Sequence, residues 1–198
     1  LLLQTPIYFP MLSVAEHAGL NMDQMQLTQG EGGYGVDLDL MERTVSPATR
    51  MFLLCNPHNP VGHAFTRAEL EGMAAICARH DLVICSDEIH GELVYTGHVH
   101  TPIAALDEEI GQRTITLIAP SKTFNVAGLK FSVAVIPNPA LREAFLAACR
   151  GIVPGISVLA YTAARAAYAH GDPWLQELLP YLEGNRNLVQ STVRDRFP

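Results

Sequence analysis

Short apolar runs recur along the chain and alternate with longer stretches in which apolar residues follow a helical spacing. Runs this short are typical of buried strands rather than of helices. Alternation of buried strands with helical segments is typical of a mostly parallel sheet with helices on both faces. The pattern predicts an α/β protein with a three-layer α/β/α sandwich. The apolar runs lie at 1–4, 51–55, 82–86, 114–119 and 131–136, and a more polar strand is predicted near 23–28.

The segments between these strands carry start and stop signals for helices. Pro10 can open a helix that Gly19 ends. Thr66 is in the N-cap position of a helix over 67–80, with Glu69 at the capping-box position. Three further helices are predicted over 139–149, 156–170 and 173–195.

Composition and charge exclude several classes of protein. The chain has 198 residues, 48% of them hydrophobic and 17% charged, with a net charge of -7. Nucleic-acid binding needs a basic face, so we expect no nucleic-acid partner. No apolar run reaches the roughly 18 residues of a membrane span. The four cysteines form no CxxC pair, which predicts reduced thiols in a cytoplasmic protein.

Four of the predicted strands are followed by residues with distinctive side chains. Tyr8 follows the first strand and Asn59 follows MFLLC, while Asp87 follows LVICS and Lys122 follows TITLIA. In open α/β sheets, ligands bind just beyond the carboxyl ends of the strands. An aromatic ring, an amide, a carboxylate and an amine at one edge suit a charged, planar, phosphorylated aldehyde.

Each of these side-chain types has a chemical use toward such a ligand. A lysine amine forms an imine with an aldehyde. A carboxylate beside a pyridine nitrogen keeps that nitrogen protonated, so that the ring can accept electrons. An amide can donate a hydrogen bond to the phenolate oxygen of the ring, and an aromatic side chain can stack on its face. Ser121 and a second cation, Lys130, can bind the phosphate.

Three motifs resemble those of a known family. NPHNPVG, SDEIH and SKTFNVAGLK are similar to the motifs of fold-type I pyridoxal 5'-phosphate (PLP) enzymes, the aspartate aminotransferase superfamily. DEIH together with SKTFN resembles the cystathionine β-lyase branch, typified by the maltose-regulon modulator. The likeness runs from TPIY to the helix after DPW. It implies the large domain of a PLP-dependent transferase fold.

The resemblance also implies roles for individual residues. Lys122 matches the lysine that holds PLP as a Schiff base, and Asp87 matches the partner of the pyridinium nitrogen. Asn59 matches the donor to the ring hydroxyl oxygen, and Tyr8 matches the residue stacked on the ring.

The resemblance extends to three further positions. Ser121 and Lys130 match phosphate contacts, although many aminotransferases carry arginine where Lys130 stands. His90 stands where aminotransferases commonly carry a tyrosine that also reaches the ring oxygen. This departure favours the lyase branch, in which an amino acid with a sulfur substituent is cleaved to a thiol, pyruvate and ammonia.

Other interpretations stay open beside this one. The same residues would serve a class I/II aminotransferase, and a PLP-fold module with a regulatory protein-binding role is a second alternative. Family members usually form homodimers, so the resemblance implies a homodimer. The histidines show no metal-ligand spacing, and we expect no metal site. The glycine-rich run at 31–35 predicts a flexible turn.

The site implied by the resemblance is incomplete within these residues. The glycine-rich turn that contacts the phosphate is expected before residue 1, and the arginine that binds the substrate carboxylate is expected after residue 198. We expect residues 1–170 to form the central part of the PLP-binding large domain. Residues 171–198 are expected to form a long helix that leads toward a small domain. The piece alone is expected to be inactive.

Overall fold

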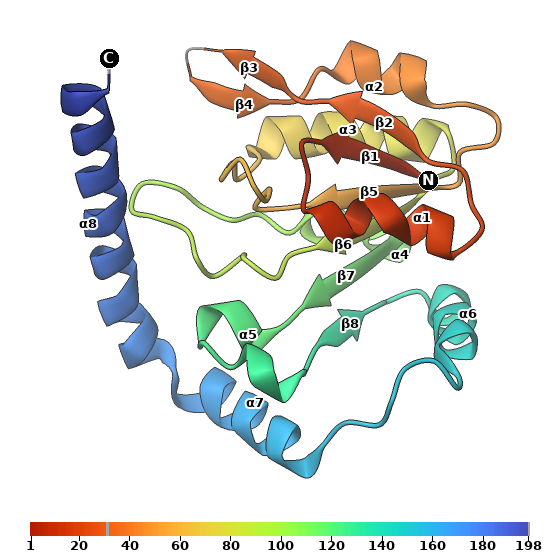
Figure 1. Cartoon of the computed structure of the whole chain (residues 1–198). Coiled ribbons are helices and arrows are strands. Elements are labelled where there is room, and N and C mark those ends of the chain that lie inside the picture. Colours follow the sequence, from red (N-terminus) through yellow and green to blue (C-terminus); the bar gives the residue numbers. More distant parts are fainter. Residues whose placement is uncertain (31, 198) are drawn as a thin grey trace.

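A six-stranded sheet forms the centre of the computed structural model, which describes residues 1–30 and 32–197 (Figure 1). The strand order is β2-β1-β5-β6-β7-β8, and all neighbours are parallel except β7 and β8. The predicted mostly parallel α/β architecture is therefore confirmed. The strands are β1 (Leu2–Thr5), β2 (Asp23–Gln26), β5 (Met51–Cys55), β6 (Val83–Asp87), β7 (Thr114–Ile118) and β8 (Val133–Val135).

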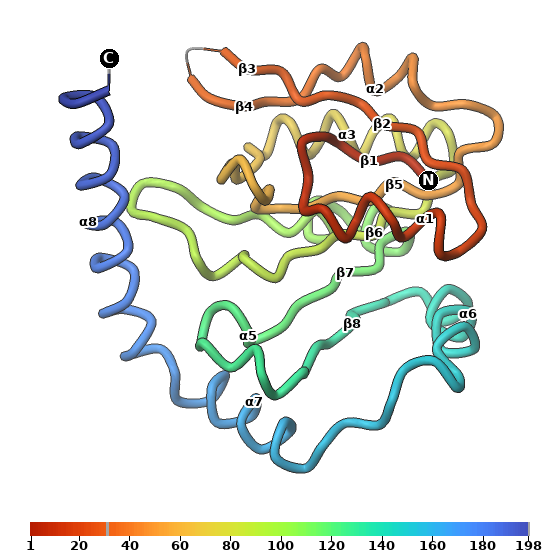
Figure 2. The backbone as a smooth tube through the Cα atoms, viewed as in Figure 1, coloured from red at the N-terminus to blue at the C-terminus, as the bar shows by residue number. Residues whose placement is uncertain are grey.

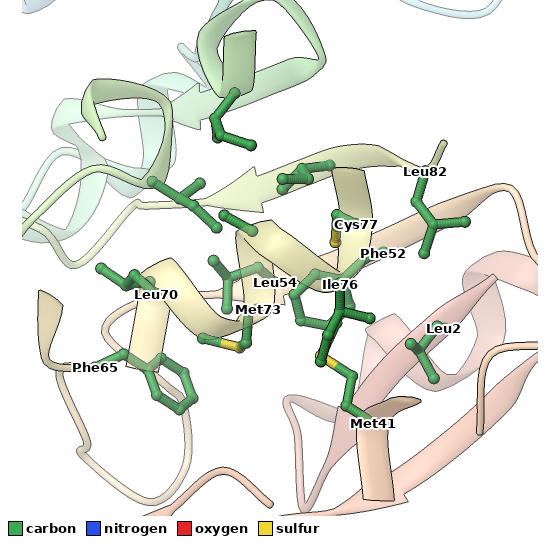
Figure 3. Packing of buried hydrophobic residues seen from close by; sticks show 14 of the residues in the cluster. Leu2, Met41, Phe52, Leu54, Phe65, Leu70, Met73, Ile76, Cys77 and Leu82 are labelled. Carbon is green, nitrogen blue, oxygen red and sulfur yellow. The ribbon is translucent and has the colours of Figure 1, made fainter. Parts of the chain in front are cut away.

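Successive residues of the central strands pack on opposite faces of the sheet, because strand side chains alternate. On one face, Phe52 and Leu54 of β5 pack with Met73 and Ile76 of α3 (Arg67–Arg79), as Figure 3 shows. Burying a side chain of this size stabilises the fold by about 1.5–3 kcal/mol. Helices α2 (Leu38–Thr44) and α4 (Glu108–Gln112) also contribute to this face.

The opposite face carries a smaller buried cluster. Leu3, Leu53 and Cys55 pack there with Ile7 and with Met11 of a 3-10 helix, η1 (Phe9–Ser13). Helix α1 (Val14–His17) continues from η1. The sheet thus lies between two helical layers, as the sandwich requires.

Several predicted helices begin and end close to the expected residues. Thr66 Oγ1 accepts from Glu69 N at 3.3 Å, and Thr66 N donates to Glu69 Oε2 at 2.8 Å. The predicted capping box of α3 is therefore confirmed. The remaining long helices are α6 (Pro139–Cys149), α7 (Val158–His170) and α8 (Asp172–Arg196).

Other local predictions need correction. The helix expected from Pro10 is a 3-10 turn followed by the short α1, and β8 is shorter than 131–136 and antiparallel. Gly33–Gly35 of the glycine-rich run is strand β4, which pairs with β3 (Thr28–Gly30), while Glu31 lies outside the described residues. Helix α2 was not expected. These elements are short, so they lack a long apolar pattern.

A long loop connects β6 to the 3-10 helix η2 (Ile103–Ala105) and reaches the side of α8 (Figure 2). Thr96 Oγ1 donates to Glu183 Oε2 at 3.1 Å, and the Arg186 guanidinium lies 4.7 Å from the centre of the Tyr95 ring. The loop that follows Asp87 is thereby attached to the C-terminal helix. Among the helices that the structure describes, none combines the length and the apolar character needed to cross a bilayer.

Candidate active site

Four neighbouring parallel strands end at one edge of the sheet, and each is followed by a predicted site residue. Tyr8 follows β1, Asn59 follows β5, Asp87 ends β6 and Lys122 follows β7. The β5 and β6 ends are level, because Cys55 is the register partner of Asp87. The fold therefore brings the four predicted residues to the same edge.

Asp87 has two titratable side chains near it, those of His90 and Lys122. Its Oδ1 accepts from Ile89 N at 3.2 Å. Burial raises the pKa of Asp87, whereas the Ile89 N–H and the nearby charges of His90 and Lys122 lower it. Asp87, His90 and Lys122 therefore act on one another electrostatically across two strand ends.

Glu88 follows Asp87 in sequence but points to the other face of the sheet. Its side chain is only 2% exposed. Ser86 Oγ donates to Glu88 Oε1 at 2.8 Å, and His100 Nε2 lies 2.9 Å from Glu88 Oε2. The pair of acidic residues is thus divided between Asp87, which lies near His90 and Lys122, and Glu88, whose buried contacts attach the following loop.

The turn after β5 is held by buried hydrogen bonds. Asn56 is fully buried, donates from Nδ2 to Thr101 O at 3.2 Å and accepts at Oδ1 from Phe65 N at 3.2 Å. Asn59 N donates to Cys55 Sγ at 3.5 Å, and burial raises the pKa of the Cys55 thiol to about 11. Asn56 therefore serves the turn, whereas the partly exposed Asn59 is free to serve a ligand.

Lys122 lies in a single-turn helix, α5 (Pro120–Thr123), directly after β7. Its side chain is exposed, and Ser121 beside it is half-buried. Lys130 is also exposed and ends the 3-10 helix η3 (Ala127–Leu129) with a left-handed φ of 53°. Asn125 has a similar φ of 54°. Such conformations are strained for residues other than glycine and occur often at functional sites.

Tyr8 and His90 border the same edge. Tyr8 is 45% exposed, and its ring contacts Phe9 edge-on with 5.3 Å between the ring centres. Burial lowers the pKa of His90, and the Asp87 carboxylate opposes that effect. A partly exposed ring and a neutral imidazole at neutral pH are compatible with contacts to a planar ligand.

Sequence patterns did not predict the buried histidine contacts next to this site. The His58 ring nitrogens lie near two backbone carbonyls, and His100 contacts Glu88. The partners are distant in sequence, so spacing gave no signal for them. Within residues 1–30 and 32–197, no three His, Cys, Asp or Glu side chains are grouped to hold a metal ion.

The fold and the strand-end residues can now be compared with known proteins. Cystalysin from Treponema denticola, in a structure that contains a pyridoxal 5'-phosphate cofactor, superimposes with a TM-score of 0.96 at 31% identity. The match covers 100% of this chain and 50% of that one. The chain therefore has the fold of the large domain of PLP-dependent transferases, as its motifs implied.

The sequence comparisons identify the family. The model for aminotransferase class I and II matches residues 1–196, and the chain belongs to this family. Cystathionine beta-lyase PatB from Bacillus subtilis (strain 168) is 38% identical over 98% of this chain and 51% of that protein. Protein MalY from Escherichia coli (strain K12) is 33% identical over 99% of this chain and 50% of that protein. The chain spans about half the length of these relatives.

Proposed function

We propose that this chain is the cofactor-bearing part of a PLP-dependent carbon–sulfur β-lyase. The observation that carries the proposal is the set of Tyr8, Asn59, Asp87 and Lys122 at the ends of four adjacent parallel strands. The likeness to a protein named cystathionine beta-lyase supports a sulfur-containing amino acid as the substrate.

The chemistry of the side chains fits PLP. Burial makes the charged form of Asp87 costly, and a protonated pyridine nitrogen beside it would supply the missing positive charge and an N–H donor. Thr123 Oγ1 next to Lys122 is buried and has no hydrogen-bond partner within the described residues, so a polar group beside Lys122 has unused hydrogen-bonding capacity.

Each predicted residue receives one task toward the cofactor. Lys122 Nζ would bond to the aldehyde carbon, and Asp87 would hold a proton at the ring nitrogen. Asn59 would donate to the ring oxygen, and Tyr8 would cover one face of the ring. Ser121 and Lys130 are proposed to contact the phosphate, and His90 is proposed to lie near the ring oxygen.

The proposed reaction divides the work between the cofactor and the chain. Bound PLP supplies a ring that accepts the electron pair left when the substrate α-proton departs. Lys122 Nζ, freed when the substrate amine takes its place on the aldehyde carbon, would take that proton as the general base. The bond between the β-carbon and sulfur then breaks, and sulfur leaves as a thiol. With one water molecule, the remainder of the substrate is released as pyruvate and ammonia.

The experiment is an assay of the full-length protein with cystathionine and other cysteine S-conjugates. The proposal requires equal amounts of pyruvate, ammonia and thiol, and none of them from the Lys122→Ala variant. Wild-type protein that binds PLP but releases no pyruvate from any of these substrates would overturn the lyase assignment.

An aminotransferase is the second candidate, because the matching family model carries that description. The same residues would serve it, with the proton returned to the cofactor carbon instead of loss of the sulfur group. Adding an amino-acid donor alone separates the two candidates. A lasting change of the cofactor to its amine form, with a keto acid released and no thiol, supports transamination.

We also propose a cytoplasmic homodimer. Four free cysteines, two of them with pKa values raised to about 12 by burial, suit a reducing compartment.

Large exposed apolar side chains gather around the start of α7, as expected of a protein interface. They are Ile152, Val153, Ile156, Val158 and Leu159. Light scattering of the full-length protein tests the dimer, and a monomer at working concentrations contradicts it.

A further inference from the structure

Hydrogen bonds to the backbone carbonyls of neighbouring residues hold the segment that carries Tyr8. Thr5 O accepts from Leu27 N at 2.8 Å, and Tyr8 O accepts from Met11 N at 2.9 Å. Ile7 is buried in the cluster that includes Cys55. Pro6 has no N–H, so its carbonyl is its one backbone hydrogen-bonding group. The partner of that carbonyl therefore decides how this segment is held at the sheet edge.

The partner of Pro6 is the ring of His58, which is 1% exposed. His58 Nε2 lies 2.8 Å from Pro6 O, and Nδ1 lies 3.2 Å from Cys55 O. Burial lowers the pKa of His58, whereas the contacts with the Pro6 and Cys55 carbonyls oppose that effect. A neutral ring has one N–H to donate, and the shorter distance assigns it to Nε2. His58 thus joins the Pro6 segment to the turn after β5.

The His58 ring itself is held firmly. His58 N donates to His63 O at 2.7 Å, His58 O accepts from Gly62 N at 2.8 Å, and the ring contacts Phe65 edge-on at 5.9 Å. Residue 59, which follows directly, is the proposed amide donor. A rigid imidazole therefore connects the segment that carries Tyr8 to the turn that carries Asn59.

We propose that His58 is a positioning residue, whose Nε2–H holds the Pro6 carbonyl and thereby fixes the spacing between Tyr8 and Asn59. The inference rests on the proposed function, which assigns those two residues to PLP. His58 contacts Pro6, which lies two residues before Tyr8, although His58 and Pro6 are 52 positions apart in sequence. It would set the width of the gap into which the ring enters, without touching the ring itself.

Three variants of His58 separate this task from simple packing. His58→Gln keeps an N–H donor that can reach Pro6 O, whereas His58→Asn is one methylene shorter and cannot reach it. His58→Phe retains an aromatic ring of similar shape but has no donor. If packing were the whole role, Phe would be the mildest change; for the proposed role, Gln is the mildest.

The first measurement needs no cofactor. Amide exchange of the full-length, PLP-free protein should be faster at Met11 and Leu27 in His58→Asn and His58→Phe than in wild type, because both amides donate to the segment around Pro6. His58→Gln should resemble wild type. The control is His63→Gln, since His63 bonds to Glu69 rather than to Pro6. Unchanged exchange in both Asn and Phe variants would overturn the proposed contact.

The second measurement is PLP affinity by spectroscopic titration of the full-length protein. His58→Asn and His58→Phe should bind PLP about tenfold more weakly, as for the loss of one hydrogen bond, and His58→Gln and His63→Gln within about threefold of wild type. In a double-mutant cycle with Tyr8→Ala, the His58→Phe effect should largely disappear. Additive effects would show that His58 does not act through Tyr8 and would overturn the proposal.

The two hypotheses fail in different ways. Wild-type protein without PLP affinity would remove the proposed function and, with it, the cofactor role of His58, while the exchange result would still decide the contact with Pro6. Wild type that binds PLP, with affinity unaffected in the Asn and Phe variants, would leave the proposed function standing and overturn the positioning role alone.

Discussion

The two halves of the candidate site differ in how they are built. At the ends of β5 and β6, side chains such as Asn56, His58 and Glu88 are buried and hydrogen-bonded. Beyond β7, Lys122 and Lys130 lie exposed on one-turn elements. The half that would hold the ring nitrogen and oxygen is fixed by the protein core, whereas the half that would form the covalent bond is open.

This difference follows from where the two halves lie in the sheet. β5 and β6 have neighbours on both sides and contribute to packed clusters. β7 is followed by α5 and η3, and its outer neighbour β8 is only three residues long. We infer that substitutions in the β5–β6 half change both stability and function, whereas substitutions beyond β7 change function with little loss of stability.

The largest effect is expected from Lys122→Ala. Loss of the covalent attachment and of the general base should lower kcat/KM by about 10⁴-fold. Because Lys122 is exposed, the unfolding midpoint should stay close to that of wild type. Borohydride treatment should fix PLP to the Lys122 peptide of wild type only, as measured by mass spectrometry. Attachment at another lysine would refute the assignment.

Asp87→Asn should lower kcat/KM by about 10³-fold, since the amide does not hold a proton at the ring nitrogen. In cofactor-free protein the same change should raise the free energy of unfolding by about 1 kcal/mol at pH 7. Folding raises the pKa of Asp87, so the charged carboxylate destabilises the folded state at pH values above that pKa. The gain should therefore shrink as the pH falls toward the ordinary value of 3.8, as denaturation at several pH values can show. A constant gain would contradict this account.

Glu88→Ala tests the structural member of the acidic pair. Removing a buried carboxylate that bonds to Ser86 and His100 should cost about 3 kcal/mol of unfolding free energy, measured by urea denaturation. Glu71→Ala is the matched control, because its ion pair with Arg67 is exposed and worth about 0.5 kcal/mol at most. Equal losses from the two changes would mean that burial of Glu88 is not decisive.

The smallest effect is expected from Lys130→Ala. If Lys130 contacts the phosphate, PLP affinity should fall about tenfold, while the unfolding free energy should change by no more than about 0.5 kcal/mol. Lys130→Arg should preserve affinity. The loss of PLP affinity in Lys130→Ala should change when inorganic phosphate is added as a competitor. A loss that is the same with and without phosphate would argue against a phosphate contact.

The positions of the central strands, and of the residues that follow them, were predictable because both are read from short stretches of sequence. MFLLC and the residues after it needed no knowledge of distant partners, and the capping box of Thr66 and Glu69 is a contact over three residues. The same holds for the strand-end positions of Asp87 and Lys122. Their roles toward PLP stay predictions.

Features that depend on distant contacts could not be predicted in this way. His58 and Pro6 are 52 positions apart, and His100 meets Glu88 across a loop whose path no pattern determines. The 3-10 form of Phe9–Ser13 and the antiparallel pairing of β8 likewise depend on packing against other elements. Local propensity is a weak guide where such contacts decide the outcome.

The alternation of Ser86, Asp87 and Glu88 has a consequence for how the chain can change in length. Deleting or inserting one residue within β6 would exchange the faces of the two acidic side chains, presenting Glu88 to the site and turning Asp87 toward His100. The exposed stretch at 97–99 has no such alternation to preserve. Insertions and deletions among relatives of this chain should therefore occur at 97–99 and be absent from β6.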